Sequence, residues 1–227
     1  MTSVLDKALQ LHRDGRTAEA MTHFKQALEA EPQNFSALMG LSAGHRMLGQ
    51  HEDASRILAE AIKVRPDSDD AWFNYGFALL ALQRYAEALP CFDKVVALVP
   101  DLAEGWINRT VALSALQRFD EALTSCDRVL ALQPNNVGIL TLRAGLLQFL
   151  HRPEDALTTY RRILDFQPQD ANALCNIAVL LAGMERFREA MTVFDNALAL
   201  FPNSEELKAA RSAAEAAWKR PNGGPES

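Results

Sequence analysis

The sequence predicts an all-α fold, a solenoid built from antiparallel helix pairs, and three observations support this. Residues 81–100 and residues 115–134 match at 12 of 20 aligned positions and start 34 residues apart. Apolar residues recur at helical spacing in two successive runs of each 34-residue interval. Prolines recur with the same spacing at Pro32, Pro66, Pro100, Pro134, Pro168 and Pro202. A fold that repeats one helix pair accounts for all three.

Two further sets of residues recur every 34 positions and indicate how the paired helices pack; we call each such set a column. One column is alanine in every repeat, and the column four residues later is mostly large and apolar. Alanine suits a close approach of two helices, because a larger side chain would overpack, and the large residue fills the space beside it. The alanines are Ala20, Ala54, Ala88, Ala122, Ala156 and Ala190, and the second column is Phe24, Leu58, Phe92, Cys126, Tyr160 and Phe194. The predicted repeats are 1–34, 35–68, 69–102, 103–136, 137–170 and 171–204.

Each repeat is expected to hold a first and a second helix, as residues 104–116 and 118–134 illustrate. The proline ends the second helix, because it has no amide donor and restricts the residue before it. The polar residues that directly follow the proline are expected to cap the next first helix; they include Asp67, Asp101 and Asn135.

The C-terminal segment is expected to close the array. Residues 205–220 are predicted to form a capping helix behind Ser204, with an apolar stripe at Leu207, Ala210, Ala214 and Trp218. Residues 221–227 are predicted to be disordered. Repeats and cap occupy residues 1–220, so no second domain is expected.

Composition excludes several classes of function. The net charge of −6 does not indicate the basic surface that nucleic-acid binding requires, so no nucleic acid is expected as a partner. No run of 18 apolar residues is present, so no membrane span is expected. The charged N-terminus does not fit a signal peptide, so a cytoplasmic location is expected. The five histidines fall at unrelated repeat positions and no catalytic motif is present. We therefore expect no enzyme activity, no cofactor and no metal.

The 34-residue helix-pair pattern resembles the tetratricopeptide repeat family over residues 1–204. The repeat at 69–102 follows the family pattern well, with Trp72, Tyr75, Gly76, Leu79, Ala88, Phe92, Val95 and Pro100. The resemblance implies a right-handed superhelical α-solenoid whose first helices line a concave groove. Lys7, Arg109 and Arg143 replace a leucine of the pattern, and we expect their stems to cover the core while their charges reach water.

The implied groove carries a column of asparagines. At the sixth position of the repeats stand Asn74, Asn108 and Asn176, although Asp6, Gly40 and Leu142 interrupt the column. The column is similar to the asparagine ladder of O-linked N-acetylglucosamine transferases, which holds extended peptides. An asparagine amide can both donate to and accept from a peptide backbone.

Apolar side chains are expected to form the floor of the groove around the asparagines. The alternative is that Phe73 and Phe77 pack between helices, as apolar helix faces usually do. The floor residues are Phe73, Phe77, Ile107, Val111 and Phe149.

These features favour a non-enzymatic interaction scaffold that binds a peptide or protein segment in the groove. An alternative is a stand-alone or truncated relative that recruits substrates for a separate glycosyltransferase. Self-association is a third candidate. The family's carboxylate clamp for chaperone tails needs lysine at the fifth position, so no binding to such tails is expected; this column is Leu5, Met39, Phe73, Ile107, Thr141 and Cys175.

Overall fold

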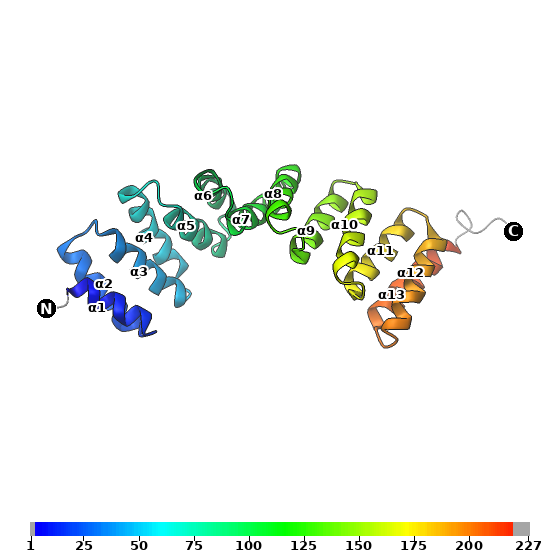
Figure 1. The fold of residues 1–227 in the computed structure, drawn as a ribbon, viewed down its shortest axis with the longest axis horizontal. Coiled ribbons are helices and arrows are strands. Elements are labelled where there is room, and N and C mark those ends of the chain that lie inside the picture. Colours follow the sequence, from blue (N-terminus) through cyan, green and yellow to red (C-terminus); the bar gives the residue numbers. More distant parts are fainter. Residues whose placement is uncertain (1–2, 220–227) are drawn as a thin grey trace. The chain divides into compact units, whose positions relative to one another are not determined.

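A computed structural model of the chain describes residues 3–219, so the predicted tail 221–227 and the last residue of the predicted cap lie outside it. The described residues form helices and no strand (Figure 1). The helices are α1 (Val4–Arg13), α2 (Thr17–Ala30), α3 (Phe35–Met47), α4 (His51–Val64), α5 (Asp69–Ala81), α6 (Tyr85–Leu98), α7 (Ala103–Ala115), α8 (Phe119–Leu132), α9 (Val137–Phe149), α10 (Pro153–Phe166), α11 (Ala171–Gly183), α12 (Phe187–Leu200) and α13 (Glu205–Trp218).

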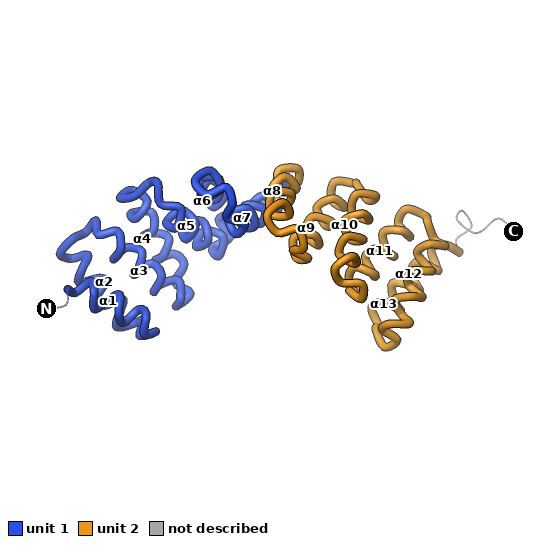
Figure 2. Tube along the Cα trace, viewed as in Figure 1, with its two compact units in different colours: residues 1–118 blue, residues 119–227 orange. Residues whose placement is uncertain are grey.

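The chain divides into two compact units, residues 1–118 with α1 to α7 and residues 119–227 with α8 to α13 (Figure 2). Within each unit, every helix packs against the next one along the chain. Some first helices also contact the next first helix. Helix α1 contacts α3, and α5 contacts α7. This arrangement confirms the predicted all-α solenoid of helix pairs. The exact division of residues 1–204 into six repeats stays a prediction.

Every first helix except α7 begins behind a polar side chain that caps it. The oxygen of Asn34 accepts a hydrogen bond from the Ala37 amide at 3.0 Å, and the Ser68 hydroxyl accepts one from Ala71 at 3.2 Å. The prediction that Asp67, Asp101 and Asn135 cap these helices is therefore wrong. The turn after each proline is one residue longer than expected, so the cap falls on the next residue, and Leu102 supplies no side-chain cap at all.

The turn inside each helix pair requires a residue in the left-handed region. Gly15 and Gly49 supply it in the first two pairs, with φ of 73° and 71°. The later turns use residues with a Cβ, which strains the backbone at each of them. These residues are Gln83, Gln117, His151 and Glu185, with φ between 55° and 61°.

The alanine column and its large neighbours form the core. The six alanines are at most 1% exposed, and Phe24, Phe92 and Phe194 are fully buried. Gly76 illustrates how closely the helices approach, since a Cβ added there would lie 2.8 Å from Cζ of Phe92 and 3.0 Å from Cβ of Cys91. The packing inferred from the two columns is thus present.

Arginines on first helices make ion pairs with aspartates of the preceding second helix. Arg109 Nε donates to Asp93 at 2.7 Å, and Arg143 and Arg211 make the same contact across the same 16-residue interval, each at 2.8 Å. The Arg109 side chain is only 16% exposed. The charge of Arg109 therefore reaches a carboxylate, rather than water alone as the sequence suggested. The aspartates paired with the second and third arginines are Asp127 and Asp195.

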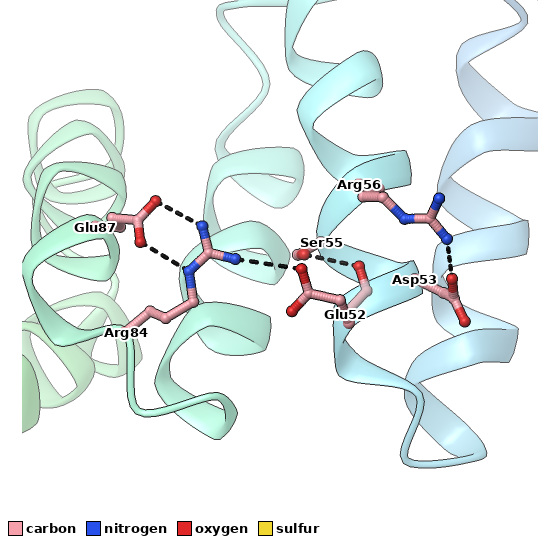
Figure 3. A network of polar contacts seen from close by, with 6 residues as sticks. All are labelled: Glu52, Asp53, Ser55, Arg56, Arg84 and Glu87. Atoms are coloured by element: carbon pink, nitrogen blue, oxygen red, sulfur yellow. Dashed lines mark hydrogen bonds and ion pairs between the residues drawn. The ribbon is translucent and has the colours of Figure 1, made fainter.

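A second set of ion pairs follows the turns between paired helices. Arg84 holds Glu87 through two hydrogen bonds of 2.7 Å and reaches Glu52 of the preceding helix pair at 3.5 Å (Figure 3). Arg186 repeats the pattern with Glu189 and Glu154. These groups are exposed, so each pair contributes little to stability. At these two turns the second carboxylate, Glu52 or Glu154, comes from the preceding helix pair.

Helix α13 packs on the helix pair before it. Leu207 and Ala214 of α13 are buried against the preceding helices, and the Trp218 ring stacks on Phe187 at 6.3 Å. Helix α13 therefore covers apolar surface of α11 and α12. Its role as the cap of the array stays a prediction.

Gly76→Ala is expected to lower the free energy of unfolding by up to about 2 kcal/mol. The clash with Phe92 costs about 1 to 3 kcal/mol, and the gain in helix propensity offsets about 1 kcal/mol of it. Gly145→Ala is the matched control, because nothing lies within 4 Å of the added Cβ in α9, and it should stabilise. Urea denaturation followed by circular dichroism measures both. Stabilisation by both substitutions would contradict the close approach at Gly76.

Gln83→Gly is expected to raise the free energy of unfolding by about 0.5 to 1 kcal/mol, since glycine adopts positive φ without the Cβ clash. Gln83→Ala is the control, because it removes the same side-chain atoms but keeps the Cβ. Thermal unfolding should rank glycine above glutamine and alanine. An equal melting temperature for glycine and alanine would argue against strain at this turn.

Candidate functional site

The three predicted asparagines lie on first helices, Asn74 on α5, Asn108 on α7 and Asn176 on α11, and all are half-buried. The Asn74 side-chain amide donates to the carbonyl of Asp70 at 2.7 Å, so its donor is engaged within its own helix. Within residues 3–219, the side chains of Asn108 and Asn176 make no hydrogen bond to another residue. Their amide groups therefore remain available to a ligand.

An exposed apolar residue follows each asparagine after three positions. Phe77, Val111 and Val179 are 38%, 42% and 47% exposed. Residues three apart lie on the same face of a helix, so each asparagine has an exposed apolar neighbour. Val179 was not among the predicted site residues, although its equivalence to Phe77 and Val111 at the ninth repeat position is a signal that could have identified it.

Helix pairs without an asparagine at the sixth position also lack an exposed large apolar residue at the ninth position. Their ninth positions hold Leu9, Ala43 and Gly145, none of which is a large exposed side chain. The two features therefore occur together on α5, α7 and α11. This co-occurrence within one chain favours a shared role for the two positions.

The remaining predicted floor residues differ among themselves. Phe73 is half-buried, and its ring meets that of Phe92 edge-on at 6.1 Å, so its main contact is with the core. Ile107 is also half-buried. Phe149 is 69% exposed and stacks on Phe119 at 5.3 Å. The packing alternative thus applies to Phe73, whereas Phe77 and Phe149 are open to solvent.

The structure brings four of the predicted residues onto two helices in contact. Asn74 and Phe77 lie on α5, and Asn108 and Val111 lie on α7, which packs against α5. The guanidinium of Arg46 on α3 lies 5.8 Å from the centre of the Phe77 ring, a cation–π contact. We call these four residues the α5–α7 face. Asn176 and Phe149 belong to the other unit.

Two of the three cysteine thiols have a raised pKa. Burial raises the pKa of the Cys91 thiol to about 12, and the thiol is hydrogen-bonded to the Glu87 carbonyl at 3.4 Å. Burial, and then the charge of Glu206, also raise the pKa of Cys175. A raised thiol pKa keeps the sulfur protonated and a poor nucleophile. Among residues 3–219, no three His, Cys, Asp or Glu side chains are grouped as a metal site.

Cys91 is expected to resist alkylation in the folded chain. At pH 7.5 a thiol with a pKa of about 12 is almost entirely protonated, and the residue is only 2% exposed. Iodoacetamide treatment followed by peptide mass spectrometry should leave Cys91 unmodified, with partly exposed Cys175 labelled faster. Denatured protein is the control and should be labelled at both. Rapid labelling of folded Cys91 would contradict its buried, protonated state.

No helix in the described part of the chain is both long enough and apolar enough to cross a membrane. Family profiles described as tetratricopeptide repeat match residues 44–103, 78–137 and 11–61. A profile described as the N-terminal TPR repeats region of Psidin matches residues 113–214. No curated protein matches the chain at a significant level. The profiles together span residues 11–214.

Solved structures share the fold at low sequence identity. YrrB, titled a TPR protein with an unusual peptide-binding site, is 18% identical with a TM-score of 0.71, covering 83% of this chain and 97% of its own. MamA AMB-1 is 24% identical with a TM-score of 0.68, covering 73% and 90%. MamA from Desulfovibrio magneticus RS-1 is 18% identical with a TM-score of 0.67, covering 74% and 94%.

Proposed function

Because this chain belongs to the tetratricopeptide repeat proteins, which act as protein-interaction scaffolds, we propose that it is non-enzymatic and binds an extended segment of a partner protein along its first helices. One observation carries the proposal. Each of α5, α7 and α11 pairs a half-buried asparagine with an exposed apolar residue three positions later. The α5–α7 face holds two such pairs on helices in contact.

The chemistry of this face suits an extended peptide. Unpaired backbone amides and carbonyls of such a peptide need both acceptors and donors, which the free amide of Asn108 supplies. Phe77 and Val111 offer apolar surface that a ligand can remove from water. The polar groups contribute orientation and the apolar groups contribute affinity. The description of YrrB as a peptide-binding TPR protein supports this kind of ligand for the fold.

We do not extend the proposal to recruitment for a glycosyltransferase. The sixth positions of three predicted repeats are Asp6, Gly40 and Leu142, so an uninterrupted row of amides is absent. The two asparagines of the α5–α7 face lie on helices in contact, which supports binding of a short segment.

The α5–α7 face is tested by selecting peptides from a random library on the wild-type chain and measuring their affinity by calorimetry. Asn108→Ala is expected to weaken binding about tenfold, since a lost hydrogen bond leaves a peptide group unpaired. Val111→Ser and Phe77→Ser should weaken it further, since each removes apolar contact. Asn74→Ala should have a smaller effect, because the Asn74 donor is already engaged.

Matched controls separate the face from general effects on the chain. Asn196→Ala and Asn203→Ala remove exposed asparagines outside the first helices, and Leu98→Ser removes an apolar residue that is 36% exposed on α6. Each variant must retain wild-type circular dichroism. Selected peptides that bind the α5–α7 variants and the controls equally well would refute the proposed location.

A further inference from the structure

A cavity of about 410 Å³ lies within the second unit, between the second helices α8 and α10 and over the first helix α9. Its size is within the range of pockets that hold small ligands. Two guanidinium groups line it, Arg143 from α9 and Arg162 from α10. None of its residues belongs to the α5–α7 face, so its role is independent of the proposed peptide binding.

Arg143 is held in place by two hydrogen bonds. Its Nε donates to Asp127 at 2.8 Å, and its Nη1 donates to the Thr159 hydroxyl at 2.7 Å. That hydroxyl is buried and donates in turn to the Asp155 carbonyl at 2.8 Å. An arginine has five N–H donors, so three of those on Arg143 remain without a partner among the described residues. The guanidinium is therefore fixed and still able to donate.

Arg162 is fixed at one point only. Its Nη2 donates to the carbonyl of Pro134, in the turn between α8 and α9, at 2.8 Å. Within residues 3–219, no carboxylate forms an ion pair with it. The carboxylate of Asp155, which also lines the cavity, is held by Arg152 at 2.7 Å. Arg162 therefore brings a positive charge that nothing else in the cavity neutralises.

The balance of charges and donors indicates what the cavity binds. Arg143 and Asp127 neutralise each other, as do Arg152 and Asp155, which leaves the single charge of Arg162. Arg162 uses one of its five N–H donors and Arg143 uses two of its five, so both can donate to a ligand that carries one negative charge. A carboxylate meets both conditions and matches the planar fork of a guanidinium. A dianion would carry more negative charge than the single charge of Arg162 can balance.

The floor of the cavity is apolar. Leu130, Ala131 and Leu140 line it beside the two arginines. The equivalent position to Leu140 holds the larger Trp72 and Trp106 in two other first helices, and a tryptophan would fill more of this space. The floor therefore has room for a short hydrocarbon body attached to the anionic group.

We propose that the α8–α9–α10 cavity binds a carboxylate on a short apolar body, with Arg162 as the charge that recognises it and Arg143 as a fixed donor beside it. The carboxylate belongs either to a free small acid or to the C-terminus of a peptide, and the two sources share this chemistry.

The experiment titrates the full chain, labelled with ¹⁵N, with four probes: butyrate, an acetylated Ala-Val dipeptide with a free carboxylate, butanol and inorganic phosphate. Butyrate or the dipeptide is expected to give saturable shifts of the Arg143 and Arg162 side-chain signals, in the millimolar range typical of so small a ligand. The tighter of these two probes identifies the source of the carboxylate. Arg162→Gln is expected to weaken that binding about tenfold, the loss of one charge-assisted hydrogen bond.

Arg161→Gln is the matched control, because it removes the same charge from the neighbouring position of α10, outside the cavity lining. It should bind like wild type, and Arg162→Lys should retain part of the affinity. Each variant must keep the wild-type melting temperature. Four results would overturn the proposal: no saturable shift with either carboxylate, equal binding of butanol, tighter binding of phosphate, or equal losses in Arg161→Gln and Arg162→Gln.

Discussion

The structure depends on the close approach of two helices at an alanine, with a large side chain four residues later filling the space beside it. Ala88 and Phe92 are both fully buried, and Gly76 has no room for a Cβ beside that ring. Because one helix pair buries only one side of each helix, its remaining apolar surface must be covered by the neighbouring pairs. The same packing thus creates both the pair and the need for its repetition.

Neighbouring helix pairs meet in one of two ways at the seventh residue of the first helix. Where the seventh residue of a first helix is Arg109, Arg143 or Arg211, the residue 16 earlier is an aspartate. Where that seventh residue is apolar, as at Leu41, Tyr75 and Ile177, the residue 16 earlier is Lys25, Ala59 or Arg161, none of them acidic. An arginine opposite a lysine would leave a partly buried charge unpaired, so an aspartate stands opposite each of these three arginines.

The 34-residue spacing was enough to predict the fold, because the same apolar pattern recurs in every repeat. The caps were misplaced by one residue, since only the path of the turn decides whether Asp67 or Ser68 reaches the Ala71 amide. The pattern within one repeat does not show contacts between repeats, so the pairing of Arg143 with Asp127 could not be predicted. For the site, the sequence identified the asparagine column, and burial separated Phe73 from Phe77.

The proposed binding residues and the core residues occupy different positions of the same helix. Asn108 and Val111 lie on α7 beside Thr110 and Ala112, which are fully buried. Substitution at Asn108 or Val111 changes what the helix presents to a partner, whereas substitution at Ala112 changes how it packs. In the second unit, the side chain of Arg143 combines the two roles. It links the second helices α8 and α10, and it also lines the cavity. A ligand at Arg143 would therefore act on the packing of α8, α9 and α10, whereas a ligand on the α5–α7 face would leave the core contacts unchanged.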